Sequence, residues 1–137
     1  MAFFEWNDQY SVGVANVDEQ HKKLVGYLND LFEALNVGKG KEILDSILDN
    51  MVEYTQYHFA TEEKLMKLHG YPGYDDHKKK HDKLAEHVLD LKSQYAAGNI
   101  VKVSPIQIGI FLKDWLSKHI MGTDKLFGPF LNSKGVQ

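Results

Sequence analysis

Hydrophobic positions recur alternately three and four residues apart along most of the chain, and this spacing marks one face of an α-helix. The pattern predicts four helices, over residues 17–36, 41–69, 76–97 and 105–121. Strand-like alternation is weak, and the chain contains no repeat or low-complexity segment. We therefore predict an all-α protein, a single domain over residues 1–137, folded as an up-down-up-down four-helix bundle. A short N-terminal arm and a short C-terminal helical segment should flank the bundle.

Polar residues and glycines at the segment boundaries support these helices. Asn16 followed by Glu19 matches a capping box, and Ser104-Pro105 with Gln107 matches a second one that places proline at the first helical position. Glycines follow the expected helix ends at Gly70, Gly98 and Gly122.

Histidines and a glutamate interrupt the apolar stripe of every helix. The interrupting residues are His21, His58, Glu62, His77, His81 and His119. A single histidine on such a stripe is usually a core residue with a hydrogen-bond partner, but five in four helices are unlikely to be independent accidents. Each buried polar group without a partner costs about 1–3 kcal/mol, and a metal cluster would supply partners directly.

The positions of these residues along the bundle agree with a shared site. In an up-down-up-down bundle, the first and third helices start at the end where the second and fourth finish. At about 1.5 Å rise per residue, the six side chains fall within roughly three turns of that end. His77 and His81 are four residues apart, as are His58 and Glu62, so each pair shares a helix face.

Asp124 is a further candidate ligand. It follows His119 by five residues, which would place the two side chains on different faces of an unbroken α-helix. We expect Gly122 to end the helix and to let the aspartate turn back toward the histidines. Glu63, next to Glu62, should point about 100° away and act as a surface or outer residue of the site.

Five imidazoles and two carboxylates are too many for one metal ion. Structural zinc is usually four-coordinate, and imidazole with carboxylate suits iron, manganese or cobalt. Two six-coordinate ions that share two carboxylates and one solvent-derived bridge need six further donors. Five histidines fill five of these positions and leave one open for an external ligand.

Composition narrows the possible functions. The chain has 137 residues, a formal net charge of -3 and no cysteine, which excludes disulfides, thiolate metal sites and thiol catalysis. We expect no nucleic-acid binding, because no overall positive charge attracts it, and no membrane insertion, because apolar runs such as IGIFL are too short. The N-terminus lacks the features of an export signal, so we expect a cytoplasmic protein. In HKKKH, the three lysines Lys78, Lys79 and Lys80 should face solvent.

Four segments together resemble the hemerythrin family in its bacterial single-domain form. They are DEQHKKL, HFATEEKLM, GYPGYDDHKKKHDKL and WLSKHIMGTD, and the similarity covers essentially the whole chain. The resemblance implies a four-helix bundle around a non-haem di-iron centre that binds dioxygen reversibly. His77, His81 and His119 would hold one iron and His21 and His58 the other. Glu62, Asp124 and an oxo or hydroxo group would bridge the two irons.

The resemblance also implies an apolar pocket for dioxygen at the open position of the second iron. The matching side chains here are Trp6, Leu24, Phe59, Trp115, Leu116 and Ile120. Ordinary core packing is the competing interpretation for each of these six residues.

Three functions remain open on the sequence. The first is a dioxygen-binding protein, monomeric and without enzymatic activity, that carries, stores or senses dioxygen or delivers it to an oxygen-consuming enzyme. The second is a di-iron oxidase or peroxidase, or an iron-handling protein, on the same bundle. Carboxylate-rich oxidases use paired Glu-x-x-His motifs, however, and this chain has none. The third is a metal-free bundle whose histidines respond to pH.

Overall fold

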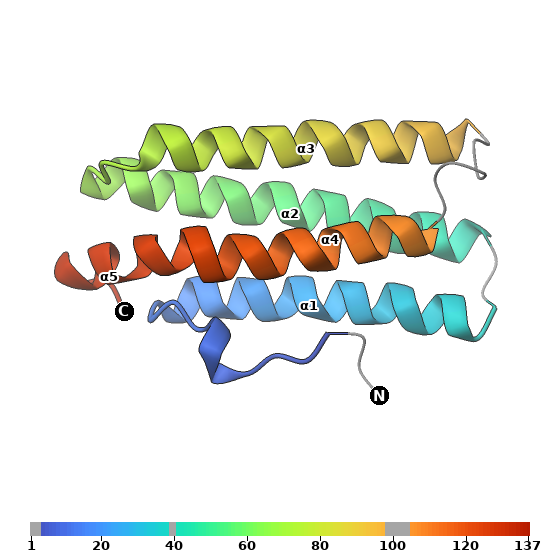
Figure 1. Ribbon diagram of the computed structural model, residues 1–137, viewed down its shortest axis with the longest axis horizontal. Helices are drawn as coiled ribbons and strands as arrows, with labels where there is room; N and C mark the ends of the chain where they lie inside the picture. The colour runs from blue at the N-terminus through green and yellow to red at the C-terminus, as the bar shows by residue number, and fades with distance from the viewer. Residues whose placement is uncertain (1–3, 39–40, 98–104) are drawn as a thin grey trace.

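The computed structural model describes residues 4–38, 41–97 and 105–137, and it confirms the predicted bundle. Its four long helices are α1 (Ala15–Asn36), α2 (Lys41–His69), α3 (Tyr74–Ala96) and α4 (Pro105–His119). Figure 1 shows them side by side with alternating directions, α1 and α3 starting at the end where α2 and α4 finish. A π-helical turn, η2 (Ile120–Asp124), and a final helix, α5 (Lys125–Ser133), follow α4 without a break. No described segment is a strand.

The predicted stripes form the core of the bundle. On α1, Val17, Leu24, Leu28 and Leu31 are all buried, and the one histidine of this helix, His21, is buried between them. On α2, alternating steps of three and four residues predict Leu65 as the next core residue after Glu62, but Leu65 is only partly buried and Met66 is fully buried. Met66 lies four residues after Glu62, and a step of four follows the α-helical period of 3.6 residues more closely than a step of three.

The start of α1 differs from the prediction, because Asn16 and Glu19 do not form a capping box. The helix begins at Ala15, and the residue before it, Val14, offers no side-chain cap. Asp18 instead reaches back to the preceding loop and accepts hydrogen bonds from the Val12 N–H at 2.9 Å and the Ser11 hydroxyl at 2.5 Å. A carboxylate in the first turn is also favoured by the helix dipole. The second predicted cap, at Ser104, lies outside the described residues.

The end of the fourth helix also differs from the prediction. Gly122 does not end the helix, which widens into η2 and continues as α5. The predicted short C-terminal helical segment is thus confirmed, but it is continuous with α4. Gly70 does end α2 in the left-handed region, with φ of 70°, as predicted. Gly98 lies outside the described residues.

The N-terminal arm closes one side of the bundle by packing on α1 and α5. Phe4 and Asn29 exchange two hydrogen bonds, from the Phe4 N–H to Oδ1 at 2.8 Å and from Nδ2 to the Phe4 carbonyl at 2.9 Å. Asn132 on α5 donates to the Gly13 carbonyl at 2.9 Å. At Gly128 the two segments touch so closely that a Cβ atom would lie 1.9 Å from the Val12 carbonyl oxygen.

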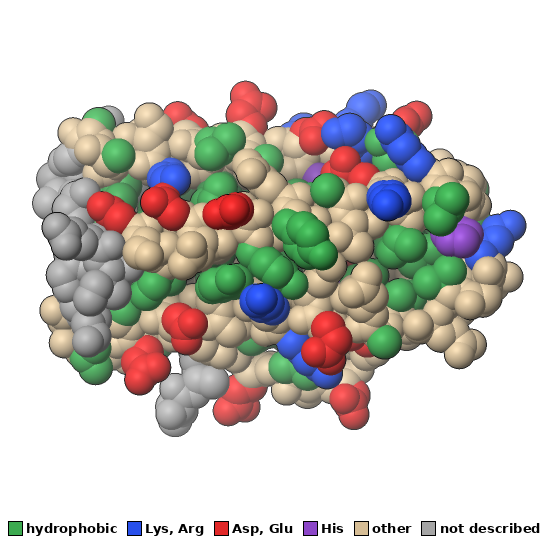
Figure 2. All heavy atoms as spheres, turned by 180° about the vertical axis from the view of Figure 1, so that it is seen from behind, with side chains coloured by type: hydrophobic (Ala, Val, Ile, Leu, Met, Phe, Trp, Pro, Cys, Tyr) green, Lys and Arg blue, Asp and Glu red, His purple; other side chains and the backbone are tan. Residues whose placement is uncertain are grey.

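The outer surface carries both signs of charge. Figure 2 shows lysines and acidic side chains interspersed with apolar ones on the face opposite to that of Figure 1. None of the described helices combines the length and the apolar character that crossing a bilayer requires.

The contact at Gly128 makes a testable prediction about stability. Gly128→Ala should lower the free energy of unfolding by about 1–3 kcal/mol, because the backbone of Val12 or of α5 must shift to admit the methyl group. Gly26→Ala is the matched control, since a Cβ atom on Gly26 within α1 meets nothing within 4 Å. That variant should be unchanged or gain about 0.5–1 kcal/mol from helix propensity. Urea denaturation measures both, and an unaffected Gly128→Ala would contradict the packing described here.

Candidate metal centre

The seven predicted metal-site side chains lie together at one end of the bundle. All are buried, and the most exposed of them, His119, retains only 5% of its accessible surface. The first turns of α1 and α3 supply His21, His77 and His81, and the last third of α2 supplies His58 and Glu62. His119 ends α4 and Asp124 ends η2. Helix positions spread over a hundred residues thus converge on one region, as the antiparallel arrangement requires.

The donor atoms form two groups that share both carboxylates. The first group is Glu62, His77, His81, His119 and Asp124, and the second is His21, His58, Glu62 and Asp124. Within each group, one donor atom of every residue lies within 4.8 Å of those of all the others. Two overlapping donor groups with common carboxylates are the arrangement expected for two ions with bridging ligands.

Asp124 faces both groups with different oxygens. Its Oδ1 lies 2.9 Å from His77 Nε2 and 3.0 Å from His119 Nε2, while its Oδ2 lies 2.9 Å from His21 Nε2. One oxygen is therefore available to each group, which is the geometry of a bridging carboxylate.

Glu62 is the second carboxylate that both groups share. Its Oε1 is 2.9 Å from His58 Nε2 and 3.6 Å from His81 Nε2, and its Oε2 is 3.8 Å from His77 Nε2. The carboxylate thus also spans histidines of both groups.

Many of these atoms are close together without being aligned for hydrogen bonds. Both oxygens of Glu62 and of Asp124, and Nε2 of His21, His58 and His77, are buried with no hydrogen-bond partner. Unpaired buried polar atoms are rare in folded proteins because each costs free energy. Metal ions would supply partners for these lone pairs, because the donor atoms of each group face one another. The donor set therefore fits a two-metal centre.

The π-helical turn explains how Asp124 joins the site. A π-helix closes its hydrogen bonds from residue i to residue i+5, so residues five apart come to the same face. Because the turn between them is π-helical, His119 and Asp124 both point inward at a separation of five residues. The sequence prediction placed Asp124 correctly but attributed its position to a helix end at Gly122, which is wrong.

The pKa values of the two buried carboxyl groups shift in opposite directions. Burial raises the pKa of Glu62 well above the usual value of 4.5, and the nearby charge of Asp124 raises that pKa further. Burial would also raise the pKa of Asp124, but the charge of His119 and the close imidazoles of His21 and His77 hold it well below the usual value.

Three of the imidazoles are held neutral. Burial lowers the pKa of His58 to about 4. Burial also lowers the pKa values of His81 and His119, and the charges of neighbouring histidines lower them further. At His77 burial lowers the pKa, but the contact with Asp124 and the charge of Glu62 outweigh it and the net shift is upward. Neutral imidazoles are the form that metal ions bind.

Two side chains outside the cluster lie within hydrogen-bond distance of the Nδ1 atoms of cluster histidines. Gln20 Oε1 lies 2.7 Å from His58 Nδ1, and Glu63 Oε2 lies 3.0 Å from His81 Nδ1. Glu63 was predicted as a surface or outer residue, and its contact with His81 specifies that role. Gln20 was missed, although a polar residue four positions before Leu24 on the buried face of α1 was a usable signal.

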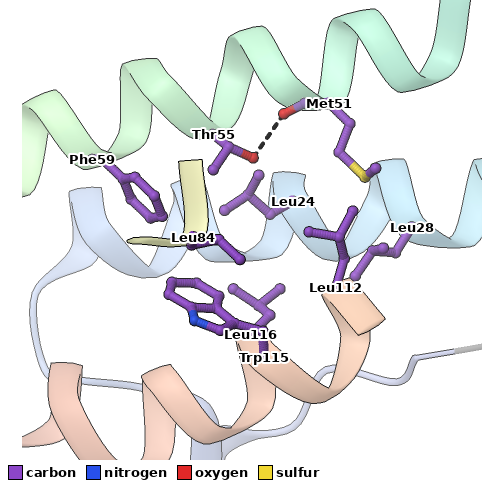
Figure 3. Close-up of a pocket in the computed structure, with 9 residues that line it drawn as sticks. All are labelled: Leu24, Leu28, Met51, Thr55, Phe59, Leu84, Leu112, Trp115 and Leu116. Carbon is purple, nitrogen blue, oxygen red and sulfur yellow. Dashed lines mark hydrogen bonds between the residues drawn. The ribbon is translucent and has the colours of Figure 1, made fainter. Parts of the chain in front are cut away.

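Four of the six predicted pocket residues line a common cavity. Leu24, Phe59, Trp115 and Leu116 enclose a volume of ≈ 20 Å³, slightly more than one water-sized sphere needs. Figure 3 shows them with the other lining residues, Leu28, Met51, Thr55, Leu84 and Leu112. The Thr55 hydroxyl donates to the Met51 carbonyl at 2.7 Å, so the lining is effectively apolar.

The other two predicted pocket residues lie elsewhere. Trp6 comes from the N-terminal arm, and its ring centroid is 6.5 Å from that of His21. Ile120 is fully buried in the π-helical turn. Neither residue lines the cavity of Figure 3.

The lysines of HKKKH face outward, as predicted. Lys78 pairs with Asp82 at 3.0 Å, Lys80 lies 3.4 Å from Asp76, and Lys79 is exposed. His87 is also exposed and packs on Phe111, and His69 lies at the end of α2 and belongs to neither donor group.

Comparisons with known proteins agree with this geometry. A sequence model described as the hemerythrin HHE cation binding domain matches residues 12–131. A bacteriohemerythrin of Methylococcus capsulatus is 34% identical over 134 residues, which are 97% of this chain and 100% of that protein. A myohemerythrin of Theromyzon tessulatum is 29% identical over 88% of each chain. A solved structure of wild-type hemerythrin superposes with a TM-score of 0.86 at 32% identity, covering 95% of this chain and 98% of that one.

The raised pKa of Glu62 predicts a pH-dependent stability in the metal-free protein. A carboxyl group whose pKa is raised on folding stabilises the folded state at low pH. This stabilisation is lost progressively as the pH rises from 4.5, the pKa in the unfolded chain, toward the pKa in the folded protein. Glu62→Gln removes the ionisable group, so the metal-free variant should gain stability relative to the unmodified chain between pH 4.5 and 7.5. The gain should approach about 1.4 kcal/mol per pH unit while the folded carboxyl stays protonated.

Urea denaturation of both metal-free proteins across this pH range measures the difference. The metal-loaded proteins give the opposite sign, because the variant loses a negatively charged donor. A stability difference that did not change with pH would show that Glu62 is not held protonated.

Proposed function

The chain belongs to the hemerythrin family, and we propose that it binds dioxygen reversibly at a non-haem di-iron centre. The observation that carries this proposal is the pair of donor groups that share Glu62 and Asp124. A single ion would leave several of the inward-facing Nε2 and carboxylate oxygen atoms without partners, whereas two ions would supply partners for both donor groups.

We propose the following ligand set for the two irons. His77, His81 and His119 hold one iron, and His21 and His58 hold the other. Glu62, Asp124 and an oxo or hydroxo group bridge them. The contacts of Asp124 Oδ1 with His77 and His119, and of Oδ2 with His21, support this division. Five imidazoles on two six-coordinate, triply bridged ions leave one position free for dioxygen.

The two irons supply the electrons that reversible dioxygen binding requires, and the surrounding residues keep water away. Phe59 stacks on His81 with ring centroids 3.8 Å apart, and Trp115 stacks on His119 at 4.3 Å. These two aromatic rings and the leucines Leu24 and Leu116 separate the imidazoles from the apolar cavity of Figure 3. A dry surrounding slows the loss of bound ligand to water and favours reversibility.

We propose binding rather than enzymatic turnover as the main activity. The donor set contains five imidazoles and only two carboxylates. Neutral donors stabilise high iron oxidation states less than carboxylates do, which supports reversible binding over oxidation of a substrate. The relatives named above carry names of oxygen-binding proteins.

We further propose that the chain is one domain and acts as a monomer. The match to the family over residues 12–131 and the single continuous core support one domain. A sizing measurement tests the monomer, and an oxygen dissociation curve separates a carrier with intermediate affinity from a store with high affinity.

Metal analysis and absorption spectra test the proposed centre. The purified chain should contain two irons and show a visible band that appears with dioxygen and disappears on its removal. His81→Ala should lose iron and lower the thermal stability, because it removes a donor and leaves its neighbours unpaired. Lys79→Ala, a solvent-facing change two residues away, should keep both irons and the band. Retention of two irons by His81→Ala, or absence of a reversible band in the unmodified chain, would contradict the proposal.

The cavity makes a separate prediction about the lifetime of the oxygenated form. Leu116→Tyr places a hydroxyl in the apolar lining and should change the rate of autoxidation without removing iron. Leu89→Tyr is the control, because Leu89 is 47% exposed on α3 and away from the cavity. The decay of the visible band measures the rate. Equal rates in Leu116→Tyr and the unmodified chain would remove Leu116 from the dioxygen pocket.

A further inference from the structure

The Nδ1 atoms of the cluster histidines differ in their hydrogen-bond partners. His81 and His58 belong to different donor groups, and each has its Nδ1 within hydrogen-bond distance of a side chain. Nδ1 of His21 and Nδ1 of His77 are buried without a partner. Side chains outside the cluster therefore fix His81 in one group and His58 in the other, and these two side chains differ in charge.

On one side, the fixing group is the carboxylate of Glu63. Its Oε2 lies 3.0 Å from His81 Nδ1, and its Oε1 lies 3.5 Å from the ammonium of Lys78. Glu63 retains 20% of its side-chain exposure, so the carboxylate stands at the boundary between the cluster and solvent. Lys78 also pairs with Asp82 at 3.0 Å, which leaves it only partly available to offset the charge of Glu63.

On the other side, the fixing group is the neutral amide of Gln20. Its Oε1 lies 2.7 Å from His58 Nδ1, and its Nε2 donates to the Thr61 hydroxyl at 3.3 Å. This second contact orients the amide so that its oxygen, rather than its nitrogen, meets the imidazole. Gln20 is only 5% exposed.

Both contacts fix the tautomer of the imidazole. A carboxylate or an amide oxygen can only accept, so Nδ1 must carry the proton in each ring. The lone pair of Nε2 then points into the cluster, where His81 Nε2 lies 3.1 Å from His119 Nε2. A carboxylate partner also makes an imidazole a stronger electron donor to a metal than a neutral partner does.

From these contacts we infer that Glu63 is a positioning residue that makes the two metal positions electronically unequal. Through His81 it stabilises the higher oxidation state of the iron held with His77 and His119. Gln20 orients His58 for the other iron without adding charge. The inference rests on the proposed di-iron function, and it assigns to Glu63 and Gln20 an electronic difference that adds to the unequal number of histidines at the two irons.

Four variants separate the hydrogen bond from the charge. Glu63→Gln keeps an acceptor for His81 but removes the negative charge, whereas Glu63→Leu removes both. Gln20→Glu adds a charge at the other imidazole. Asp82→Asn is the matched control, because Asp82 contacts Lys78 in the same way but touches no imidazole.

The first measurement uses zinc in place of iron and needs no dioxygen. In the full-length, ¹⁵N-labelled, zinc-loaded protein, the His81 Nδ1 proton should be protected from exchange and shifted downfield. Protection should persist in Glu63→Gln and in Asp82→Asn and should be lost in Glu63→Leu. Glu63→Leu should also weaken metal binding by about 10- to 100-fold, the usual effect of removing an outer partner of a ligand histidine.

The second measurement is the midpoint potential of the iron-loaded proteins in a reductive titration. The potential should rise in Glu63→Gln, fall in Gln20→Glu, and change less in Asp82→Asn than in either. A purely structural role for Glu63 would leave the potential of Glu63→Gln equal to that of Asp82→Asn, which would overturn the inference. An unchanged His81 resonance in Glu63→Leu would overturn it as well.

The two measurements also distinguish this inference from the proposed function. An unmodified chain that bound iron without a reversible dioxygen band would contradict the function. The zinc resonances and the potentials would still decide the role of Glu63.

Discussion

The burial of two carboxylates and five imidazoles at one end of a small helical bundle governs most of this structure. Without metal, burial raises the pKa of Glu62 and lowers that of His58 to about 4, while neighbouring imidazoles hold the pKa of Asp124 well below its usual value. These shifts reflect the cost of burying charge, and the site keeps lone pairs without partners. A metal pair relieves all of these costs together, because it binds neutral imidazoles and ionised carboxylates. Metal binding and folding of this end of the bundle are therefore coupled.

Much of the fold and of the site followed from the periodicity of the sequence. The stripes of α1 and α3 were read correctly because their hydrophobic spacing is regular, and His21, His77 and His81 stand on them. Burial of the seven proposed ligands and their convergence were predictable from helix direction and rise alone. The dioxygen pocket stays a prediction: Leu24 and Leu116 line the cavity, whereas Trp6 and Ile120 do not.

Other features depend on tertiary contacts that leave little trace in the local sequence. A capping box at Asn16 was plausible, but the loop before α1 offered Asp18 two stronger partners in Ser11 and Val12. The π-helical turn could not be seen, because its extra residue is stabilised by what Asp124 meets inside the bundle. Gln20 was missed although its place on the buried face of α1 was a usable signal, because its partner His58 comes from another helix and only the fold brings the two together.

The continuity of α4, η2 and α5 has a consequence for how the protein is made. Proposed ligands begin at His21, near the start of the chain, and end at Asp124, which runs directly into a helix packed on the N-terminal arm. During synthesis the N-terminal part of a chain emerges first. All four long helices must therefore be synthesised before both proposed bridging carboxylates are present. Helices α1 to α3 can associate earlier, but neither donor group is complete until Asp124 has been synthesised, so the last ligand to arrive is one that both groups share.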